Sequence, residues 1–365
     1  MIKFIKKNPA IPQRWIVLTA LAYSLTAAQA QTPQAEKAFI KENMEFATKQ
    51  YSLMMQTPAQ GKNGKAIMPH SMRKDGTPSK GSIYLWTAGF FPGTLWYLSN
   101  YTGDKALQDS ALVYTHQMEP AKTFTDNHDI GFMMYCSYGN ANRFAPKDEY
   151  EDILVESARS LCTRFRHQAK VIQSWNGFRS WHGDKVYDFP VIIDNMMNLE
   201  LLFHASKVTG DESFRKVAIS HAEQVMHHQV RKDYSCFHII YYDKKTGKPI
   251  KGETSQGYSD NSAWSRGQAW GIYGFTMCYR ETKDKRFLKT AEKMADFYLD
   301  HPNLPSDKVA WWDFNAFQEG YTPGIRSNAC KMVNNYRDAS AAACVASALL
   351  ELSTYSKGSK SKKYL

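Results

Sequence analysis

The stretch "NLELLFHASKVTGDESFRKVAISHAEQVMHHQV", residues 198–230, contains two helical patterns on either side of a short turn. The first pattern is apolar nearly all round, which is typical of a buried helix. The second begins after Asp211 and carries its charges on one face, which is typical of a helix at the surface. The stretch therefore predicts a hairpin of one buried inner helix and one amphipathic outer helix.

The same unit recurs along the chain at irregular spacing. Five inner–outer pairs are separated by turns that fall near Asp104, Asp148, Asp211, Asp284 and Gly358. Residues 34–56 supply one further amphipathic helix before the first pair. Nested inner and outer helices predict an all-α fold, an (α/α)6 toroid or six-hairpin barrel, in which the inner helices surround a central cavity. Only "FHIIYYDKKTGKPI" is expected to form β structure.

Six pairs would close such a ring, whereas the patterns add up to one helix and five pairs. The sequence stops at "KKYL", where the last outer helix has barely begun. This predicts that the last inner helix is missing and that the chain is truncated at its C-terminus. An unusually short natural variant is the alternative.

The first 30 residues are typical of a signal peptide. A basic segment, "MIKFIKKNPAIPQR", precedes the apolar run "WIVLTALAYSLTA" and the small-residue pattern "AQA". The apolar run is too short to span a membrane comfortably. We therefore expect cleavage after Ala30, a single domain over residues 31–365, no membrane attachment after cleavage, and export to a bacterial periplasm.

The formal net charge of +11 does not indicate a nucleic-acid-binding protein. A duplex-binding face needs cations gathered on the folded body. Here much of the excess lies in the predicted signal and in the last ten residues, so the body is nearly balanced. The cations in these two segments are Lys3, Lys6, Lys7, Arg14, Lys357, Lys360, Lys362 and Lys363.

The cysteines and histidines do not form a metal-binding pattern. There is no C-x-x-C pair and no H-E-x-x-H motif among the six cysteines and 11 histidines. Most of the cysteines fall in apolar helical patterns, as small core residues do. We expect no metal and no cofactor; disulfides and the oligomeric state stay open.

In a toroid of this kind, the loops that lead into the inner helices converge at one mouth of the cavity. Here these loops are "LWTAGFFPG", "TDNHDIGFMM", "VIIDNMMNL", "QGYSDNSAWSRGQAWGIYG" and "NNYRDASAAA". They bring together Asp129, Asp194, His128, Gln256 and Arg266. Each aspartate could simply be a helix N-cap, because Asp is a favoured capping residue. For Asp194 the capping and the catalytic interpretations are both open from its own segment.

Tryptophans gather in or beside the same loops, and they favour a sugar as the ligand. Aromatic rings stack on the flat faces of sugars, while polar groups at the rim orient the hydroxyls. Packing in the core is the alternative for any single tryptophan. Arg266 is suited to bind a substrate carboxylate with two hydrogen bonds. The tryptophans are Trp86, Trp175, Trp181, Trp264 and Trp270.

The chain resembles the unsaturated glucuronyl hydrolases, glycoside hydrolase family 88. The resemblance rests on "WTAGFFPG", "NHDIGF", "DNMMNL", "SQGYSDNSAWSRGQAWGIYGF" and "RDASAAA", in the family's order over nearly the whole mature chain. It implies an enzyme that hydrates the C4=C5 double bond that polysaccharide lyases leave on an unsaturated uronic acid. Glycosaminoglycan-type oligosaccharides are the implied substrates.

The resemblance also implies roles for individual residues. Asp194 would be the general acid/base, and Asp129 the second essential carboxylate. A proton donor near neutral pH needs a raised pKa, so burial and Asp129 must outweigh the acidifying field of the helix start at Asp194. Independently of the resemblance, the position of Asn198, one helical turn on, suggests that it orients the Asp194 carboxylate. The implied substrate contacts are His128, His238, Gln256, Trp264, Arg266 and Trp270, with Trp86 and Trp181 as less secure matches.

Three other functions remain as alternatives. An unsaturated rhamnogalacturonyl or galacturonyl hydrolase would share the fold and the chemistry. A non-catalytic exported carbohydrate-binding protein would keep the aromatic rim without needing both Asp129 and Asp194. A helical adaptor would need no convergent Trp, His and Arg at the helix starts.

Overall fold

The computed structural model describes residues 33–56 and 67–365. The chain divides into two compact units, Met1–Leu53 and Met54–Leu365. The described part of the first unit, residues 33–53, lies in helix α2 (Pro33–Met54), so the helix expected over residues 34–56 is confirmed. The predicted signal peptide lies outside the described residues. Among the described helices, none combines the length and the apolar character that a membrane crossing requires.

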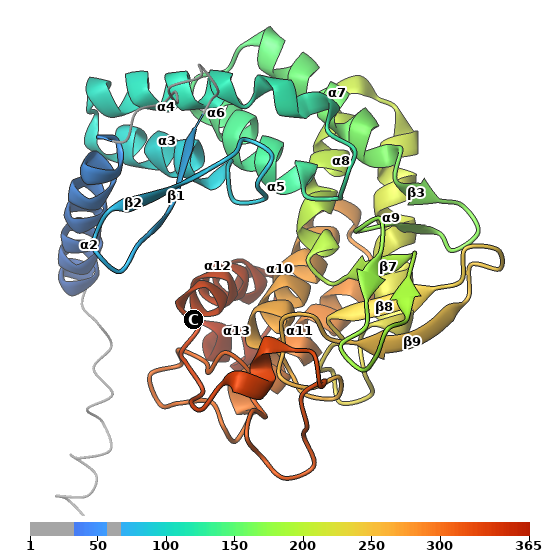
Figure 1. The fold of residues 1–365 in the computed structure, drawn as a ribbon. Helices are drawn as coiled ribbons and strands as arrows, with labels where there is room; N and C mark the ends of the chain where they lie inside the picture. The colour runs from blue at the N-terminus through green and yellow to red at the C-terminus, as the bar shows by residue number, and fades with distance from the viewer. Residues whose placement is uncertain (1–32, 57–66) are drawn as a thin grey trace, which may run out of the picture. The chain divides into compact units, whose positions relative to one another are not determined.

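Helices of the second unit follow one another in pairs (Figure 1). Each inner helix packs against the outer helix that follows it, and successive inner helices contact one another. The second inner helix is continuous through a π-helical turn. The inner helices are α3 (Phe90–Thr102), α5–η2–α6 (Ile130–Met134, Tyr135–Gly139 and Asn140–Phe144), α8 (Asn195–Thr209), α10 (Ser265–Thr282) and α12 (Ala339–Tyr355). The outer helices are α4 (Lys105–Gln117), α7 (Asp148–Cys162), α9 (Glu212–His228), α11 (Lys285–Asp300) and α13 (Ser359–Tyr364).

This arrangement confirms the predicted all-α toroidal class and its five inner–outer pairs. The turns between partners form where the sequence indicates them. Gly103 and Gly210 end α3 and α8 with φ of 72° and 73°, a left-handed conformation that glycine adopts without strain. Asp104 and Asp211 then cap α4 and α9 with their side chains. The predicted loss of a final inner helix stays a prediction.

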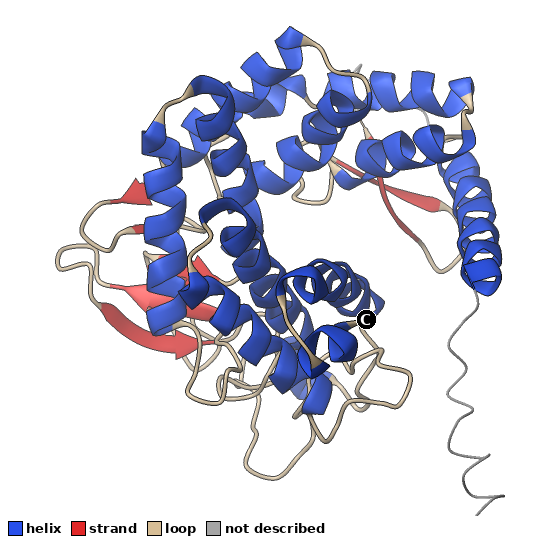
Figure 2. Ribbon diagram, turned by 180° about the vertical axis from the view of Figure 1, so that it is seen from behind, coloured by secondary structure: helices blue, strands red, loops and turns tan. Residues whose placement is uncertain are grey.

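The expectation of a single β segment is wrong, because the described residues hold four small antiparallel sheets (Figure 2). The predicted segment contains β8 and the start of β9, but every other strand is only two to five residues long. Such short strands show no alternating pattern, and a short apolar run reads equally well as helix. The strands are β1 (Met68–Met72), β2 (Pro78–Gly81), β3 (Phe165–Arg166), β4 (Val171–Ile172), β5 (Phe178–Arg179), β6 (Val186–Tyr187), β7 (Pro190–Ile192), β8 (Ile239–Tyr242) and β9 (Pro249–Glu253). Two short 3-10 turns, η1 (Glu119–Thr123) and η3 (Asn328–Lys331), complete the elements.

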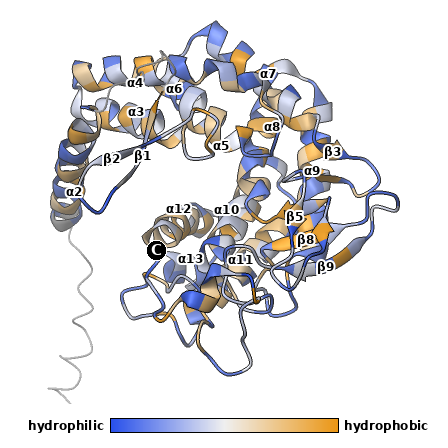
Figure 3. Cartoon of the chain, viewed as in Figure 1, coloured by the Kyte–Doolittle hydropathy of each residue, from blue (hydrophilic) through white to orange (hydrophobic). Residues whose placement is uncertain are grey.

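The three-stranded sheet β7–β8–β9 matters most for function. Strand β8 is buried at all four residues and is markedly hydrophobic (Figure 3). Its pairing with β7 places Ile192 opposite Ile239, and Ile193 N donates to His238 O at 3.0 Å. The sheet therefore brings the residue before β8, His238, beside the start of α8. The six cysteines, which all lie in described segments, are free.

Candidate active site

Asp129 and Asp194 each stand one residue before an inner helix, α5 and α8. Neither side chain hydrogen-bonds to its own helix start in the described structure. Their backbones, at φ −72°, ψ 0° and φ −55°, ψ −26°, differ from the extended conformation of a capping residue. The side chains are 15% and 13% exposed. The capping interpretation of Asp194 is therefore wrong, and both carboxylates are available for other contacts.

The two carboxyl groups are held in a state that suits proton transfer. Burial raises the pKa of Asp194 to about 7, and the negative charge of Asp129 acts in the same direction, while Arg266 opposes both. Burial likewise raises the pKa of Asp129 to about 7, against the positive charge of Arg164. The raised pKa that the catalytic interpretation of Asp194 requires is present, because burial and the charge of Asp129 outweigh Arg266 and a backbone hydrogen bond. A carboxyl with a pKa near 7 can donate a proton at neutral pH.

His238 directs an N–H group toward Asp194. Its Nδ1 atom accepts hydrogen bonds from Ser255 N at 2.9 Å and Gln256 N at 3.2 Å. This bonding leaves the ring proton on Nε2, which lies 3.8 Å from Asp194 Oδ2. Burial, together with the charge of Arg266, lowers the pKa of His238 to about 3, so the ring is neutral. Both Nε2 and Asp194 Oδ2 are buried without a hydrogen-bond partner among the described residues.

His128 repeats this arrangement at Asp129. The amide of Asn198 lies between α8 and α5: its Oδ1 accepts from Phe132 N at 2.8 Å, and its Nδ2 lies 3.4 Å from His128 Nδ1. The His128 proton is therefore on Nε2, 3.3 Å from Asp129 Oδ1. Burial lowers the pKa of His128 to about 3. The expected role of Asn198 as an orienting group for Asp194 is wrong, because Asn198 instead joins α8 to α5 and His128.

Arg266 forms a polar cluster at the first turn of α10. Its Nη2 donates to Gln256 Oε1 at 3.1 Å, and its Nη1 lies 3.3 Å from Asp338 Oδ2. The guanidinium also lies 4.9 Å from the ring centroid of Trp264, whose ring is 4.6 Å from that of His238. Arg266 and Asp338 line a cavity of about 400 Å³. The structure thus brings together Gln256, Trp264 and Arg266 with His238, as the sequence predicted.

An aromatic cluster adjoins Asp129. Trp86 contacts Phe132 in an edge-on arrangement at 5.5 Å, and Phe132 contacts Trp270 in the same way at 5.4 Å. Trp270 is buried, and its Nε1 has no hydrogen-bond partner among the described residues. A buried N–H group without a partner is unusual in a native protein. Trp86 and Trp270, which come from different inner-helix segments, are thus joined through Phe132, a ring in the first turn of the helix that follows Asp129.

Trp181 lies apart from this cluster, in the turn between β5 and β6. Its Nε1 donates to Ser255 O at 3.2 Å, next to Gln256 and to the Ser255 N–H group bound by His238. Its ring contacts Phe178 edge-on at 5.3 Å. Trp181 is therefore connected to the site through Ser255 rather than through the aromatic cluster.

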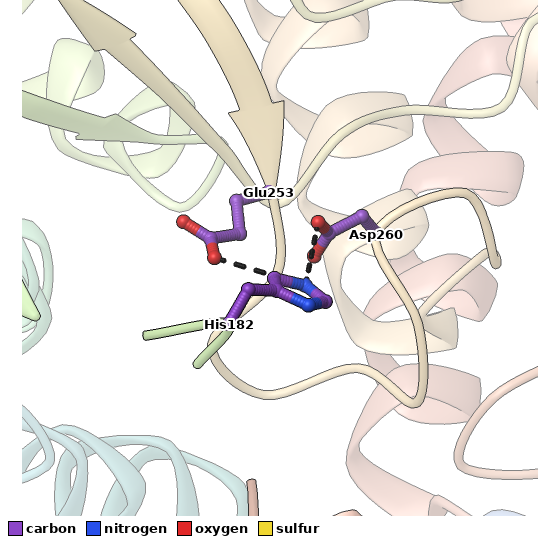
Figure 4. A group of neighbouring side chains, drawn as sticks. All are labelled: His182, Glu253 and Asp260. Atoms are coloured by element: carbon purple, nitrogen blue, oxygen red, sulfur yellow. Dashed lines mark ion pairs between the residues drawn. The ribbon is translucent and has the colours of Figure 1, made fainter. Parts of the chain in front are cut away.

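One group in the described part of the chain has the composition of a metal site. His182 Nε2 lies 2.9 Å from Asp260 Oδ2 and 3.8 Å from Glu253 Oε1 (Figure 4). Lys251 Nζ, however, lies 3.6 Å from the same Glu253 oxygen, and this charge competes with a cation. The contacts of His182 with Asp260 and Glu253 link the β5–β6 hairpin to β9 and the following loop. No metal-ligand spacing in the sequence indicates it, because His182 is far along the chain from the two carboxylates.

Arg164 acts on the site, although no sequence pattern indicates it. It follows α7 in the segment "CTRFRHQ", whose basic character is typical of a solvated helix end. In the structure it is only 3% exposed, and its positive charge acts on Asp129. Nothing in the sequence distinguishes this buried arginine from Arg166, two residues on.

Comparison with known families identifies this arrangement. The model of Glycosyl Hydrolase Family 88 matches residues 65–300, which include both aspartates, Gln256, Trp264 and Arg266. The chain belongs to this family.

Two curated relatives in the family illustrate the similarity. The chain is 45% identical over 281 residues to the unsaturated glucuronyl hydrolase of Formosa agariphila, a match that covers 77% of this chain and 65% of the relative. It is 35% identical over 286 residues to the unsaturated chondroitin disaccharide hydrolase of Streptococcus pyogenes serotype M1, covering 75% of this chain and 66% of that protein. The matched region thus spans just under two thirds of the length of these relatives.

Solved structures of the family share the fold. A crystal structure of an unsaturated glucuronyl hydrolase specific for heparin superposes with a TM-score of 0.78 at 41% identity, covering 89% of this chain and 81% of that one. An aspartate-to-asparagine mutant of the Streptococcus agalactiae enzyme, complexed with dGlcA-GalNAc6S, gives a TM-score of 0.68 at 28% identity, covering 93% and 78%.

Proposed function

We propose that this member of family 88 is an unsaturated glucuronyl hydrolase. Its substrates are Δ4,5-unsaturated uronyl oligosaccharides of the glycosaminoglycan type, which polysaccharide lyases produce. The observation that carries the proposal is the pair Asp129 and Asp194, two buried carboxyls with raised pKa values, each facing a neutral imidazole N–H. The activities named for the relatives support the substrate class.

The reaction needs one group that first donates and then accepts a proton. Asp194 protonates C4, and the electrons of the C4=C5 double bond form the new C4–H bond. Water adds to the resulting cation at C5 and gives its proton back to the Asp194 carboxylate. The hemiketal then opens: the C5–O ring bond breaks, C5 becomes a ketone, and C1 releases the aglycone sugar as it becomes an aldehyde.

The other groups have supporting roles in this proposal. Asp129 stays ionised, accepts hydrogen bonds from the sugar hydroxyls and, through its charge, keeps the proton on Asp194. The neutral His128 and His238 offer their Nε2 protons to the carboxylates or to the substrate. Because the hydrated bond is not the glycosidic bond, the spacing rule for inverting and retaining glycosidases does not apply.

The polar cluster around Arg266 is suited to bind the substrate carboxylate. A guanidinium binds a carboxylate with two parallel hydrogen bonds, and Arg266 is partly exposed beside a cavity. Trp264 lies beside the guanidinium, and Trp270 belongs to the aromatic cluster next to Asp129. Both indole N–H groups lack a hydrogen-bond partner among the described residues, and we propose that both rings contribute to sugar recognition. Trp86, Trp181 and Gln256 complete the proposed contacts.

The test uses three sets of lyase products: unsaturated disaccharides from heparin, from chondroitin and from rhamnogalacturonan. Hydration removes the absorbance of the C4=C5 bond, so turnover is followed directly. We expect loss of absorbance with the heparin or the chondroitin products. Turnover of the rhamnogalacturonan products alone would favour the alternative, an unsaturated rhamnogalacturonyl or galacturonyl hydrolase. Calorimetric binding of all three without any turnover would favour the carbohydrate-binding alternative.

We also propose that the protein is exported to a bacterial periplasm after cleavage behind Ala30. The basic segment, apolar run and small residues of "MIKFIKKNPAIPQRWIVLTALAYSLTAAQA" support this. Fractionation of expressing bacteria, with N-terminal sequencing of the periplasmic product, tests it. A cytoplasmic product that still begins at Met1 contradicts it.

A further inference from the structure

Arg164 is a buried cation that has no carboxylate partner within ion-pair distance among the described residues. It is 3% exposed and lies between α7 and β3. Its Nε donates to Gln173 O at 2.8 Å, its Nη2 to Ser174 O at 3.3 Å and Asn176 Oδ1 at 3.1 Å, and its Nη1 to Thr125 O. All four acceptors are neutral oxygens. A buried charge without a counter-ion is costly, so its presence calls for an explanation.

The hydrogen bonds of Arg164 join the loop that carries Asp129 to a second segment, which in turn contacts the residues before Asp194. Thr125 belongs to the loop that leads to Asp129, and the other acceptors lie in segment 173–176, after β4. The same segment receives His128 N on Ser174 O at 3.1 Å. It also binds the residues around Asp194, since Ile192 N donates to Ser174 Oγ at 2.9 Å. Arg164 therefore binds the Asp129 loop directly and contacts the Asp194 loop through segment 173–176.

The charge of Arg164 acts unequally on the two carboxyls. It lowers the pKa of Asp129, which burial raises, whereas it is not among the groups that act on Asp194. Burial, reinforced by Arg166, lowers the pKa of Arg164 itself to about 10, so the group stays positive at neutral pH. Asp126 and Asp129 are the carboxylates that act on it in return.

We propose that Arg164 is a positioning residue that keeps Asp129 ionised and thereby leaves the proton of the aspartate pair on Asp194. The inference rests on the proposed hydrolase function for its catalytic meaning. The statement that Asp129 is ionised and Asp194 protonated concerns the protein without substrate, and it does not depend on that function. Two carboxyls in similar surroundings would share one proton about equally, and half of the molecules would then hold it on the wrong residue. The fixed guanidinium removes this ambiguity.

Every charged or titratable group that faces the pair enters this balance. Asp129 is faced by His128 and Arg164. Asp194 is faced by Asp129, Arg266, His238 and Cys236, whose thiol stays neutral because burial raises its pKa to about 12. Both histidines are neutral at the pH values in question, because burial holds their pKa values far below 6.5. Removing Arg164 therefore raises the pKa of Asp129 relative to that of Asp194.

The test compares Arg164→Met, Arg164→Lys and a matched control, Arg166→Met. Arg166 is two residues away and also binds Gln173, through Nε to Oε1 at 2.9 Å. In Arg164→Met, the acidic limb of the pH–rate profile should move to higher pH by about one unit, because the ionisation of Asp129 loses a favourable charge, and the alkaline limb, which follows Asp194, should move less. The maximal rate should fall about tenfold, because the proton shifts toward Asp129. Arg164→Lys keeps the charge and should keep the pH limbs, and Arg166→Met should resemble the unaltered protein.

A purely structural role for Arg164 would lower the rate without moving the pH limbs, and that result overturns the proposal. A second measurement needs no substrate: carbon-13 NMR titration of labelled aspartates, assigned with Asp129→Asn and Asp194→Asn. We expect Asp129 to ionise first in the unaltered protein and at higher pH in Arg164→Met. An Asp129 titration that is unchanged by Arg164→Met also overturns the proposal, whether or not the protein hydrates unsaturated sugars.

Discussion

Asp194 and Asp211 stand at the starts of consecutive helices, α8 and α9, and the protein uses them in opposite ways. Asp211 has an extended backbone, at φ −79° and ψ 103°, and its carboxylate accepts a hydrogen bond from Ser213 N at 2.8 Å. Hydrogen bonds from Ser213 lower the pKa of Asp211. Asp194 has a helical backbone, makes no capping bond, and has a pKa raised to about 7 by burial and by Asp129.

The comparison shows that the backbone decides the role of an aspartate at a helix start. An extended residue turns its side chain toward the free N–H groups of the first turn, and the resulting hydrogen bonds stabilise the charged form. A residue already in helical conformation turns its side chain away from them. Asp129 resembles Asp194, because its side chain makes no capping bond. Asp104 and Asp284 resemble Asp211, because each has an extended backbone and caps its helix with its side chain. The two aspartates that make no capping bond are the two whose charges interact, since Asp129 raises the pKa of Asp194.

Asp194→Asn gives the largest effect that this comparison predicts. Removing the general acid should lower kcat on unsaturated disaccharides by about a thousandfold, because general acid–base catalysis contributes on that order. Binding of the substrate should persist, since the amide is nearly isosteric with the carboxyl. Absorbance assays and calorimetry measure the two quantities.

The matched control is Asp211→Asn, which changes the same residue type at the start of the neighbouring helix. Asn is as good an N-cap as Asp, so both activity and folding should be nearly unchanged. If the two variants lost activity equally, the distinction between capping and catalytic aspartates would be wrong.

The hairpins of the fold were predictable because they depend on local signals. The turn at Gly210 and Asp211 ends one helix and caps the next, and both functions belong to the residue types themselves. The β3–β4 and β5–β6 ladders were not predictable. Each strand has two residues, and its pairing depends on contacts that no local pattern records.

Part of the site was predictable for a different reason. Asp129, Asp194, His238 and Arg266 lie next to helix or strand boundaries, so a toroid brings them together once its hairpins are known. The direction of each side chain was not predictable, because it depends on φ and ψ at a single residue. The contact of Asn198 with Phe132 N, rather than with Asp194, shows this limit.

Gly131→Ala tests whether the starts of α5 and α8 must approach closely. A Cβ atom at Gly131 would lie 2.5 Å from Asn198 Oδ1 and 2.6 Å from Asn198 Cα, so the two inner helices would have to separate. We expect a loss of about 2 kcal/mol in unfolding free energy, as for other overpacked sites. Activity should fall as well, because Asp129 and Asp194 would move apart.

Gly183→Ala is the control for this change. A Cβ atom at Gly183 would meet no atom within 4 Å, so stability and activity should both be retained. Denaturant unfolding and the absorbance assay measure the two variants side by side. A Gly131→Ala protein as stable and active as the control would show that the close approach of the helices is not required.

The pH dependence of stability should have opposite signs at the two aspartates. The folded pKa of Asp194 is raised to about 7 from 3.8, so its carboxyl destabilises the fold progressively as the pH rises from about 4 to 7. Asp194→Asn removes this penalty. Relative to the unaltered protein, it should gain stability on the order of 1–2 kcal/mol at pH 8 and none at pH 4. Thermal unfolding at both pH values measures this, and a gain at pH 4 alone contradicts it.

Asp211→Ala should give the smallest effect. The lowered pKa of Asp211 means that its carboxylate stabilises the fold above the unfolded pKa and that this contribution is lost as the pH falls through the folded pKa. Replacement by alanine removes the cap and the charge, so the melting temperature should fall slightly at pH 7 and less at pH 3. The rate on unsaturated disaccharides should not change, because Asp211 lies at the start of an outer helix, where its carboxylate binds the first turn of that helix. A fall in kcat without a fall in melting temperature would connect this helix start to the site after all, and the separation between the two kinds of aspartate would have to be abandoned.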